Sequence, residues 1–415
     1  MKLSLIQNSN RFDAATHEAG TPRYFPSLTG LRAIAAFMVY FHHYGIPVSL
    51  TLGSAAVVGI VREMHTGVSV FYVLSGFLIY YRYAKRASVS WSFYRDYLVN
   101  RLARIYPMYF LVVALGSIYA LTQGKTAGIV LRDFILQVTF IRGFSDLYKF
   151  IGVAQGWSLT VEEVFYFVFP VAMLASRRLG MLTALFGTYL IGGALLSVGT
   201  AINFQGFFVG IRFVALYTFF GRAAEFFVGM FVAKAFMSGK IRPPLQRVPA
   251  LTICGCLGML GSLYGLSCLV GPGYSLGVFS PGGMVINNLI VPVCVGVFIS
   301  GLLVERSWIR AFLASRLMEL LGKSSYVFYL IHLGVFYELT SRLISQNYWV
   351  LFTLINVYAV LMYLFIEHPA NNWIKRVCAS QASRSDREAR LCVLNGVEAV
   401  QKQDSRTESQ AIGSC

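Results

Sequence analysis

Apolar residues fall in a series of blocks along the chain, each near the length that crosses the roughly 30 Å hydrocarbon layer of a membrane. One such block is compatible with the core of a soluble protein, but so many in series are not. The pattern therefore predicts an all-α polytopic membrane helical bundle with about ten transmembrane helices. The predicted spans are residues 30–47, 66–81, 102–121, 158–175, 181–199, 222–237, 250–270, 284–303, 325–344 and 348–367.

One further apolar stretch, residues 204–220, leaves a second count open. It is short and is interrupted by Arg212, and the alternative to ten spans is that it forms an extra or re-entrant helix, which gives eleven. The polar ends lie outside the apolar blocks. Residues 1–23 are predicted as a cytoplasmic N-terminal segment without a cleavable signal peptide, 24–374 as the membrane domain, and 375–415 as a flexible cytoplasmic tail.

Composition supports the membrane assignment. Of the 415 residues 56% are hydrophobic and only 13% are charged, whereas globular domains average about 25% charged residues. The net charge of +17 does not indicate nucleic acid, because the basic residues concentrate in every second loop between predicted spans. By the positive-inside rule these loops and both termini are predicted to be cytoplasmic, with anionic lipids as partners.

Ionisable residues inside spans are costly and mark candidate functional sites. Arg32 and His43 are eleven residues apart in the first predicted span, which puts them on one helical face, roughly 16 Å apart along the axis. Arg32 is expected near the cytoplasmic end and His43 in the outer half. The alternatives are a snorkelling arginine and a hydrogen-bonded core histidine.

His332 is predicted at a depth similar to that of His43, since both lie in spans that run in the same direction. His42 points about 100° away from its neighbour on an ideal helix. Glu162 and Glu225 are each predicted one turn inside the outer end of a span. A carboxylate close to an imidazole fixes its tautomer and raises its basicity, although structural pairing of these groups remains the alternative.

Two arginines open the third predicted span. Arg101 and Arg104 share one helical face at a helix N-terminus, an arrangement that suits phosphate groups. The alternative is the positive-inside rule alone. The seven cysteines form no CxxC pair, and the chain contains no Walker A, GxSxG or HExxH motif. These absences argue against a metal site, nucleotide hydrolysis and a serine hydrolase.

Seven segments, taken together and in order, resemble acyltransferase family 3, a family of integral membrane acyltransferases that includes polysaccharide O-acetylases and macrolide acyltransferases. The first segment includes Arg32, which with His43 matches an Arg-x10-His motif, and the fourth contains a Trp-Ser-Leu-x-x-Glu element that ends at Glu162. Each motif is weak by itself, whereas the ordered series is specific. The segments are residues 24–33, 67–79, 101–107, 156–163, 222–230, 325–332 and 367–369.

The resemblance implies transfer of an acyl group, usually acetyl, from acyl-CoA to a hydroxyl of a carbohydrate or lipid-linked glycan in the bacterial inner membrane. It implies acyl-CoA as donor substrate and no permanently bound cofactor or metal. Arg101 and Arg104 are expected to bind acyl-CoA.

The catalytic residues that the resemblance implies are His43, Arg32, Glu162 and His332. His43 is predicted as general base, with Glu162 or His332 orienting it, or else as carrier of a transient acyl group. The rival interpretation is a transporter or flippase that uses the same charges as a translocation path. The sequence leaves the acceptor and the oligomeric state open.

Overall fold

The computed structural model of the protein describes residues 24–51, 53–85, 90–242 and 248–378, and within these ranges the chain is helical without a β-strand. Two isolated bridges are its only extended pairings there. The helices are α2 (Pro26–Tyr44), α3 (Val48–Thr51), α4 (Ala55–Arg62), α5 (Gly67–Tyr83), α6 (Trp91–Thr122), α7 (Ala127–Val138), α8 (Trp157–Arg178), α9 (Met181–Ile202), α10 (Ile211–Tyr217), α11 (Phe219–Met237), α12 (Ala250–Cys268), α13 (Pro281–Val285), α14 (Val291–Val304), α15 (Trp308–Leu313), α16 (Arg316–Ile331), α17 (Val335–Leu343) and α18 (Tyr348–Met362).

Six short helical turns complete the architecture and supply several site residues. They are the 3₁₀ turns η1 (Glu63–Thr66), η2 (Ile141–Phe144), η3 (Ala154–Gly156) and η4 (Gly277–Phe279) and the π turns η5 (Ile286–Ile290) and η6 (Tyr363–Glu367). The predicted N-terminal segment 1–23 and nearly all of the predicted tail lie outside the described residues.

Eight helical segments in the described part of the chain are long and apolar enough to cross a membrane. Each overlaps one of the ten predicted spans, while the predicted spans 30–47 and 325–344 have no counterpart among them. The polytopic helical bundle is therefore confirmed, and the count of ten stays a prediction. The eight segments are Ala55–Tyr83, Trp91–Thr122, Ala154–Arg178, Met181–Ile202, Ile211–Met237, Ala250–Cys268, Pro281–Val304 and Tyr348–Cys378.

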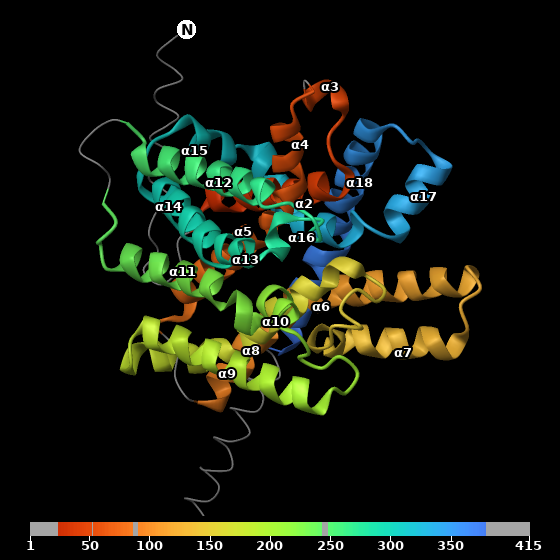
Figure 1. Cartoon of the computed structure of the whole chain (residues 1–415), viewed down its shortest axis with the longest axis horizontal. Helices are drawn as coiled ribbons and strands as arrows, with labels where there is room; N and C mark the ends of the chain where they lie inside the picture. The colour runs from red at the N-terminus through yellow and green to blue at the C-terminus, as the bar shows by residue number, and fades with distance from the viewer. Residues whose placement is uncertain (1–23, 52, 86–89, 243–247, 379–415) are drawn as a thin grey trace, which may run out of the picture.

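The periphery of the bundle is apolar. On α9 the side chains of Leu182, Phe186 and Leu190, spaced four residues apart, are all exposed. Water would disfavour such a continuous apolar face, so it is expected to face lipid. On another side α6 and α7 run next to each other and project from the bundle (Figure 1).

Helices α2, α5 and α16 lie in the middle of the bundle (Figure 1), with α2 packed against both α5 and α16 and α11 packed along α5. Glycines allow these helices to approach closely. A Cβ atom at Gly76 on α5 would overlap the carbonyl of Phe226 on α11, and one at Gly322 on α16 would overlap the carbonyl of Thr29 on α2. Small residues at helix crossings are the usual solution in membrane bundles, where close van der Waals packing drives association.

The prediction of one continuous span over residues 325–344 is wrong. Helix α16 begins at Arg316, where the Ser315 hydroxyl accepts a hydrogen bond from the Met318 amide at 3.4 Å. It ends just before His332, and Gly334 then adopts the left-handed backbone (φ 81°) that separates α16 from α17. Glycine reaches this conformation without steric strain, which explains the break. His332 therefore terminates a helix and does not lie in mid-span.

The apolar stretch 204–220 does not form a separate spanning helix. It contains the short helix α10, and the extended backbone of Thr218 then turns the chain into α11. Together these helices form the single apolar segment Ile211–Met237. A helix thus exists there, but as the first part of a bent span.

Candidate active site

Two cavities lie between the central helices. The first, which we call the basic cavity, has a volume of about 30 Å³. Its walls come from α2, α5, α6, α8 and α16. Its polar lining consists of Arg32, Ser75, Arg101, Arg104, Glu162, Tyr166 and Tyr326.

Arg101 is almost fully buried on α6 and lies among phenol rings. Its guanidinium donates a hydrogen bond to the Tyr83 hydroxyl at 3.3 Å and lies 5.3 Å from the Tyr83 ring centroid and 5.9 Å from that of Tyr166. The Arg101 Nε atom is buried and has no hydrogen-bond partner within the described residues. Cation–π contacts offset part of the cost of burying this charge. Because the Nε atom has no partner among the described residues, it can donate a hydrogen bond to an anionic ligand.

Glu162 enters the basic cavity from α8. Its carboxylate accepts hydrogen bonds from the Ser75 hydroxyl on α5 and from the Tyr166 hydroxyl one turn further along α8. All three residues line the cavity. The carboxylate is therefore held in one orientation by donors from two helices.

Arg32 lines the same cavity from α2. Its Nε atom donates to the Ser325 hydroxyl on α16 at 3.4 Å, and its guanidinium lies 5.8 Å from the centroid of the Phe71 ring. The buried Glu367 in the π turn η6 interacts electrostatically with Arg104 and Arg32. π turns are frequently found at functional sites, and this one brings an acidic group to a cluster of arginines.

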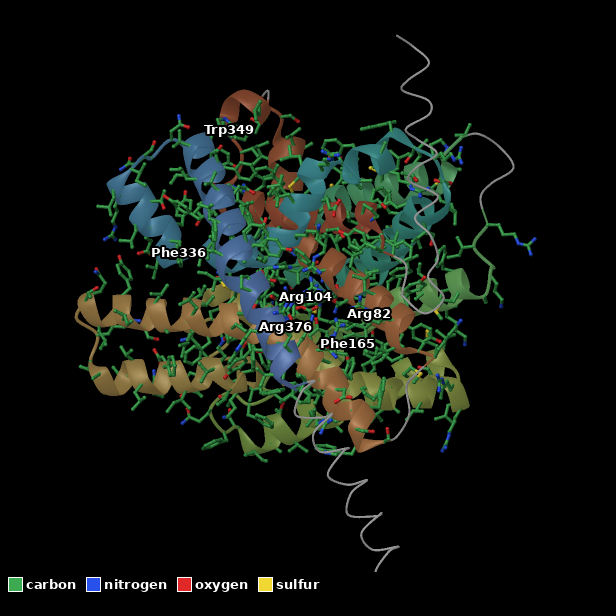
Figure 2. The ribbon with its side chains drawn as sticks, turned by 180° about the vertical axis from the view of Figure 1, so that it is seen from behind. Arg82, Arg104, Phe165, Phe336, Trp349 and Arg376 are labelled. Atoms are coloured by element: carbon green, nitrogen blue, oxygen red, sulfur yellow. The ribbon has the colours of Figure 1, made fainter. Side chains whose placement is uncertain are left out.

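Positive charge extends beyond the cavity on the same side of the molecule. The segment Tyr348–Cys378 carries Trp349 near one end and Arg376 near the other. Figure 2 shows Arg82 and Arg104 toward the Arg376 end. Lys375, next to Arg376 in the chain, interacts electrostatically with Arg101, Arg104 and Arg82. Basic residues from α5, α6 and the last helical segment thus gather around the basic cavity.

The second cavity, which we call the histidine cavity, is larger, at about 200 Å³. It lies between α2, η1, η3, α8, α10, α11, η4 and α16. Aromatic rings form much of its wall, and all of its basic groups except Arg222 are imidazoles. Its lining includes His42, His43, His65, Phe150, Trp157, Tyr217, Arg222, Phe279 and Tyr329.

His43 on α2 lies beside His332 at the end of α16, with 5.4 Å between the ring centroids. The His332 Nδ1 atom is 2.8 Å from the carbonyl oxygen of Tyr329, which only accepts, so Nδ1 carries the proton. Its Nε2 atom is then an acceptor, and it is buried without a partner in the described part of the chain. The Tyr44 hydroxyl donates to the His332 carbonyl at 2.8 Å and fixes this turn.

A second group of imidazoles borders the cavity. The His42 ring lies 4.8 Å from that of His43 and 5.4 Å from that of His65. His65 Nε2 is 3.0 Å from the carboxylate of Glu63. The Glu63 side chain is fully buried and also accepts a hydrogen bond from the Gly277 amide at 2.7 Å.

Arg222 on α11 also lines the histidine cavity, but its charge is compensated. Its guanidinium forms two hydrogen bonds to Glu225, at 2.8 and 2.7 Å, and a third to the Ser69 hydroxyl at 3.1 Å. It also lies 5.3 Å from the centroid of the Tyr72 ring. The bidentate, buried pair within α11 leaves little free charge in the cavity, and the bond to Ser69 connects α11 to α5.

The structure distributes the predicted catalytic residues over both cavities. His43 and His332 lie side by side, a proximity that the sequence analysis expected. Arg32 and Glu162 lie instead in the basic cavity, together with the predicted donor-binding arginines. Arg32 and His43 nevertheless belong to one helix, α2, which connects the two cavities.

Glu162, one of the two groups predicted to orient His43, lines the basic cavity and not the histidine cavity. The Ser158 hydroxyl on α8 is 2.7 Å from that of Tyr329, a residue of the histidine cavity. Glu162 lies one turn further along α8 and bonds to Ser75 in the basic cavity. The one helical turn between Ser158 and Glu162 therefore separates the two cavities along α8. The predicted span boundaries are not accurate to one turn, so they did not show which cavity Glu162 enters.

Two residues at the histidine cavity were not predicted from the sequence, and a third was given too little weight. Glu63 and His65 were not considered, although they stand directly before the motif at residues 67–79. His42 was expected to point away from His43, yet both line the histidine cavity. The turn η1 packs against α2, η4 donates the Gly277 amide to Glu63, and both turns line the cavity, an arrangement that no local pattern predicts.

Comparison with known proteins connects these cavities to a family. The family model described as an acyltransferase domain matches residues 25–367, which is most of the chain. An acyltransferase of Streptomyces mycarofaciens, MdmB, is 25% identical over 334 residues, covering 75% of this chain and 78% of that protein. No solved structure matches the chain significantly.

Two other relatives are longer than the matched region. A "putative O-acetyltransferase" of Staphylococcus aureus (strain COL) is 24% identical over 368 residues, covering 84% of this chain and 57% of that protein. The exopolysaccharide production protein ExoZ of Rhizobium meliloti (strain 1021) is 28% identical over 206 residues, covering 48% of this chain and 59% of that protein. The match to the staphylococcal protein thus spans little more than half of its length.

Proposed function

The chain belongs to acyltransferase family 3, and on that premise we propose that it transfers an acyl group from acyl-CoA to a hydroxyl of a carbohydrate or related cell-envelope acceptor. Acetyl is the proposed acyl group, and the bacterial inner membrane is the proposed location. The relatives named as O-acetyltransferase and as exopolysaccharide production protein support these choices.

The observation that carries the proposal is the pair of cavities joined by α2. Arg32 lines the basic cavity, and His43 lines the histidine cavity eleven residues later. The two side chains are therefore separated by roughly 16 Å along one helix. A long donor molecule with phosphates at one end and a thioester at the other fits this arrangement.

The basic cavity suits the phosphate end of the donor. Arg101 offers a buried Nε donor without a partner among the described residues, and Arg104 lines the same space. Lys375 interacts electrostatically with Arg101, Arg104 and Arg82, so further positive charge lies near the arginines of this cavity. Guanidinium groups bind phosphates through charge-assisted hydrogen bonds, which are about twice as strong as neutral ones.

The histidine cavity suits a sugar-like acceptor. Its wall includes Phe150, Trp157, Tyr217 and Phe279, which offer flat apolar faces, while the histidines offer polar atoms. Binding pockets commonly combine an apolar wall with a few polar groups that fix orientation. A sugar ring has apolar C–H faces and polar hydroxyl edges and so matches both kinds of wall.

His43 is the proposed general base. It takes the proton from the acceptor hydroxyl while the hydroxyl oxygen forms a bond to the acyl carbon and the carbon–sulfur bond breaks. The buried Nε2 acceptor of His332 is the proposed group that orients His43, because Glu162 lies in the other cavity. The leaving group is the CoA thiolate, which keeps the electron pair of the carbon–sulfur bond.

The test uses the full-length protein in lipid nanodiscs with acetyl-CoA labelled in the acetyl group. Wild type is expected to release CoA and to transfer label to a glycan-containing membrane extract. Protein that binds acetyl-CoA but never breaks the thioester would contradict the proposal and favour a carrier. A comparison of glycan masses from cells with and without the gene, in search of one lost acetyl unit, identifies the acceptor.

A further inference from the structure

Glu63 and His65 form a carboxylate–imidazole pair at the wall of the histidine cavity. Neither belongs to the residues that the proposed mechanism uses. The pair lies in η1, which packs against α2 and α12. His65 lines the cavity itself, whereas Glu63 lies behind it with a fully buried side chain.

The loop η4 holds Glu63 in place. One oxygen of the Glu63 carboxylate accepts the Gly277 amide at 2.7 Å, and the other lies 3.0 Å from His65 Nε2. Gly277 is packed so closely that a Cβ atom there would overlap the carbonyl of Leu266. Only glycine lets the backbone approach this far, so the amide that orients the carboxylate depends on this residue.

The hydrogen bonds define the tautomers. A carboxylate accepts, so the proton of His65 is on Nε2 and its Nδ1 atom is an acceptor. His42 donates from Nδ1 to the Arg62 carbonyl at 2.5 Å, which leaves its Nε2 atom as acceptor. The rings of His43, His42 and His65 follow one another at centroid distances of 4.8 and 5.4 Å.

The environments of these imidazoles differ in one respect. His42 and His332 bond to backbone carbonyls, which are neutral acceptors. Among the described histidines of the site, His65 is the one that bonds to a carboxylate. A positive charge on His65 is therefore compensated within hydrogen-bond distance, whereas a charge on His43 is not.

We propose that His65, held by Glu63, is the group that accepts the proton which His43 removes from the acceptor hydroxyl. The proton passes from His43 through the Nε2 atom of His42 to Nδ1 of His65. The resulting imidazolium forms an ion pair with Glu63 until it releases the proton to water on the acceptor side. The CoA thiolate retains the electron pair of the carbon–sulfur bond and is protonated by water on the donor side. This inference rests on the proposed function.

Removal of His65 tests the relay. In lipid nanodiscs with acetyl-CoA and an acceptor-containing membrane extract, His65→Ala is expected to lower kcat about tenfold to a hundredfold, which is less than the roughly 10²- to 10⁴-fold loss usual for a general base, because His65 acts through His43. The KM for acetyl-CoA should stay the same, because the basic cavity is untouched. Imidazole added to the buffer should restore part of kcat. A folded variant with wild-type kcat, or one whose loss imidazole does not relieve, would overturn the relay.

Glu63→Gln separates charge from structure. The amide oxygen of glutamine still accepts one hydrogen bond, but the negative charge is gone, so kcat should fall and the solvent deuterium isotope effect should rise. The control is Glu338→Gln, an acidic residue on α17 that bonds to Tyr119 outside both cavities. Equal isotope effects in wild type and Glu63→Gln would assign Glu63 a purely structural role and contradict the proposal.

A substitute variant and a comparison with His43→Ala distinguish failure of the relay from failure of the proposed function. His65→Gln, which retains polar atoms, replaces His65→Ala if the latter fails to fold in a thermal unfolding assay. If wild type itself breaks no thioester, the proposed function fails. If wild type is active and His43→Ala is not, while His65→Ala equals wild type, the relay alone fails.

Discussion

The basic cavity and the histidine cavity share the walls of α2, α8 and α16 but differ in the kind of charge they contain. The first has permanent charges, from three arginines and a carboxylate that Ser75 and Tyr166 hold in place. In the second, the exposed basic groups are imidazoles, and Arg222 is neutralised by Glu225. Fixed cations suit the binding of a phosphorylated donor, whereas groups that gain and lose protons suit the activation of a hydroxyl.

The largest expected effect is on the chemical step in the histidine cavity. His43→Ala should lower kcat by about 10²- to 10⁴-fold, the usual contribution of a general base, and leave the KM for acetyl-CoA unchanged. Release of CoA from purified protein measures both constants. A variant that unfolds at the wild-type temperature and keeps wild-type kcat would remove the distinction between the cavities.

The second effect is on donor binding in the basic cavity. Arg104→Gln should raise the KM for acetyl-CoA roughly tenfold to a hundredfold, as expected for loss of one hydrogen bond from a charged group. The change in kcat should be smaller. Arg178→Gln, at the exposed end of α8, is the matched control for loss of one positive charge. If both variants raise KM equally, only overall charge matters and the cavity has no specific role.

A smaller effect is expected when one donor to Glu162 is removed. Tyr166→Phe deletes one of the two hydrogen bonds to the Glu162 carboxylate. A single hydrogen bond contributes about 0.5–1.5 kcal/mol, so kcat/KM for acetyl-CoA should fall about two- to twelvefold. Tyr264→Phe, at an exposed position on α12, is the control. Wild-type kinetics in Tyr166→Phe would show that the orientation of Glu162 is unimportant.

The smallest expected effect is the coupling between the cavities. Because Glu162 and His43 line different cavities, the losses in His43→Ala and Glu162→Gln should add in the double variant. Independent sites typically agree with additivity within about 0.5 kcal/mol. The kcat values of the four proteins give the coupling energy. A coupling of several kcal/mol would mean that Glu162 acts on His43 after all, and the two-cavity description would be wrong.

Much of the bundle follows from hydrophobic patterning alone. Eight of the predicted spans overlap apolar helical segments, because length and apolarity are local properties of the chain. The two predicted spans without such a counterpart are 30–47 and 325–344, which contain Arg32, His43 and His332. Polar functional groups lower the mean hydropathy of a helix, so helices that carry site residues are harder to recognise from hydropathy as membrane spans.

The sequence by itself determined which site residues share a helical face. The eleven-residue interval between Arg32 and His43 places both on one face of α2, and the three-residue interval between Arg101 and Arg104 does the same on α6. Helical geometry dictates these relations wherever the helices pack. The proximity of His43 and His332 was expected from two spans running in the same direction, although His332 ends α16 and does not lie within a continuous span.

Only the tertiary structure decided which groups face each other across helices. It placed Glu162 with the arginines, and it brought Glu63 to the Gly277 amide, far away in the chain. Contacts of this kind depend on where helices start, break and cross. A shift of one helical turn, about 5.4 Å, moves a side chain from one cavity to the next, and a residue pattern does not fix position along a helix that closely.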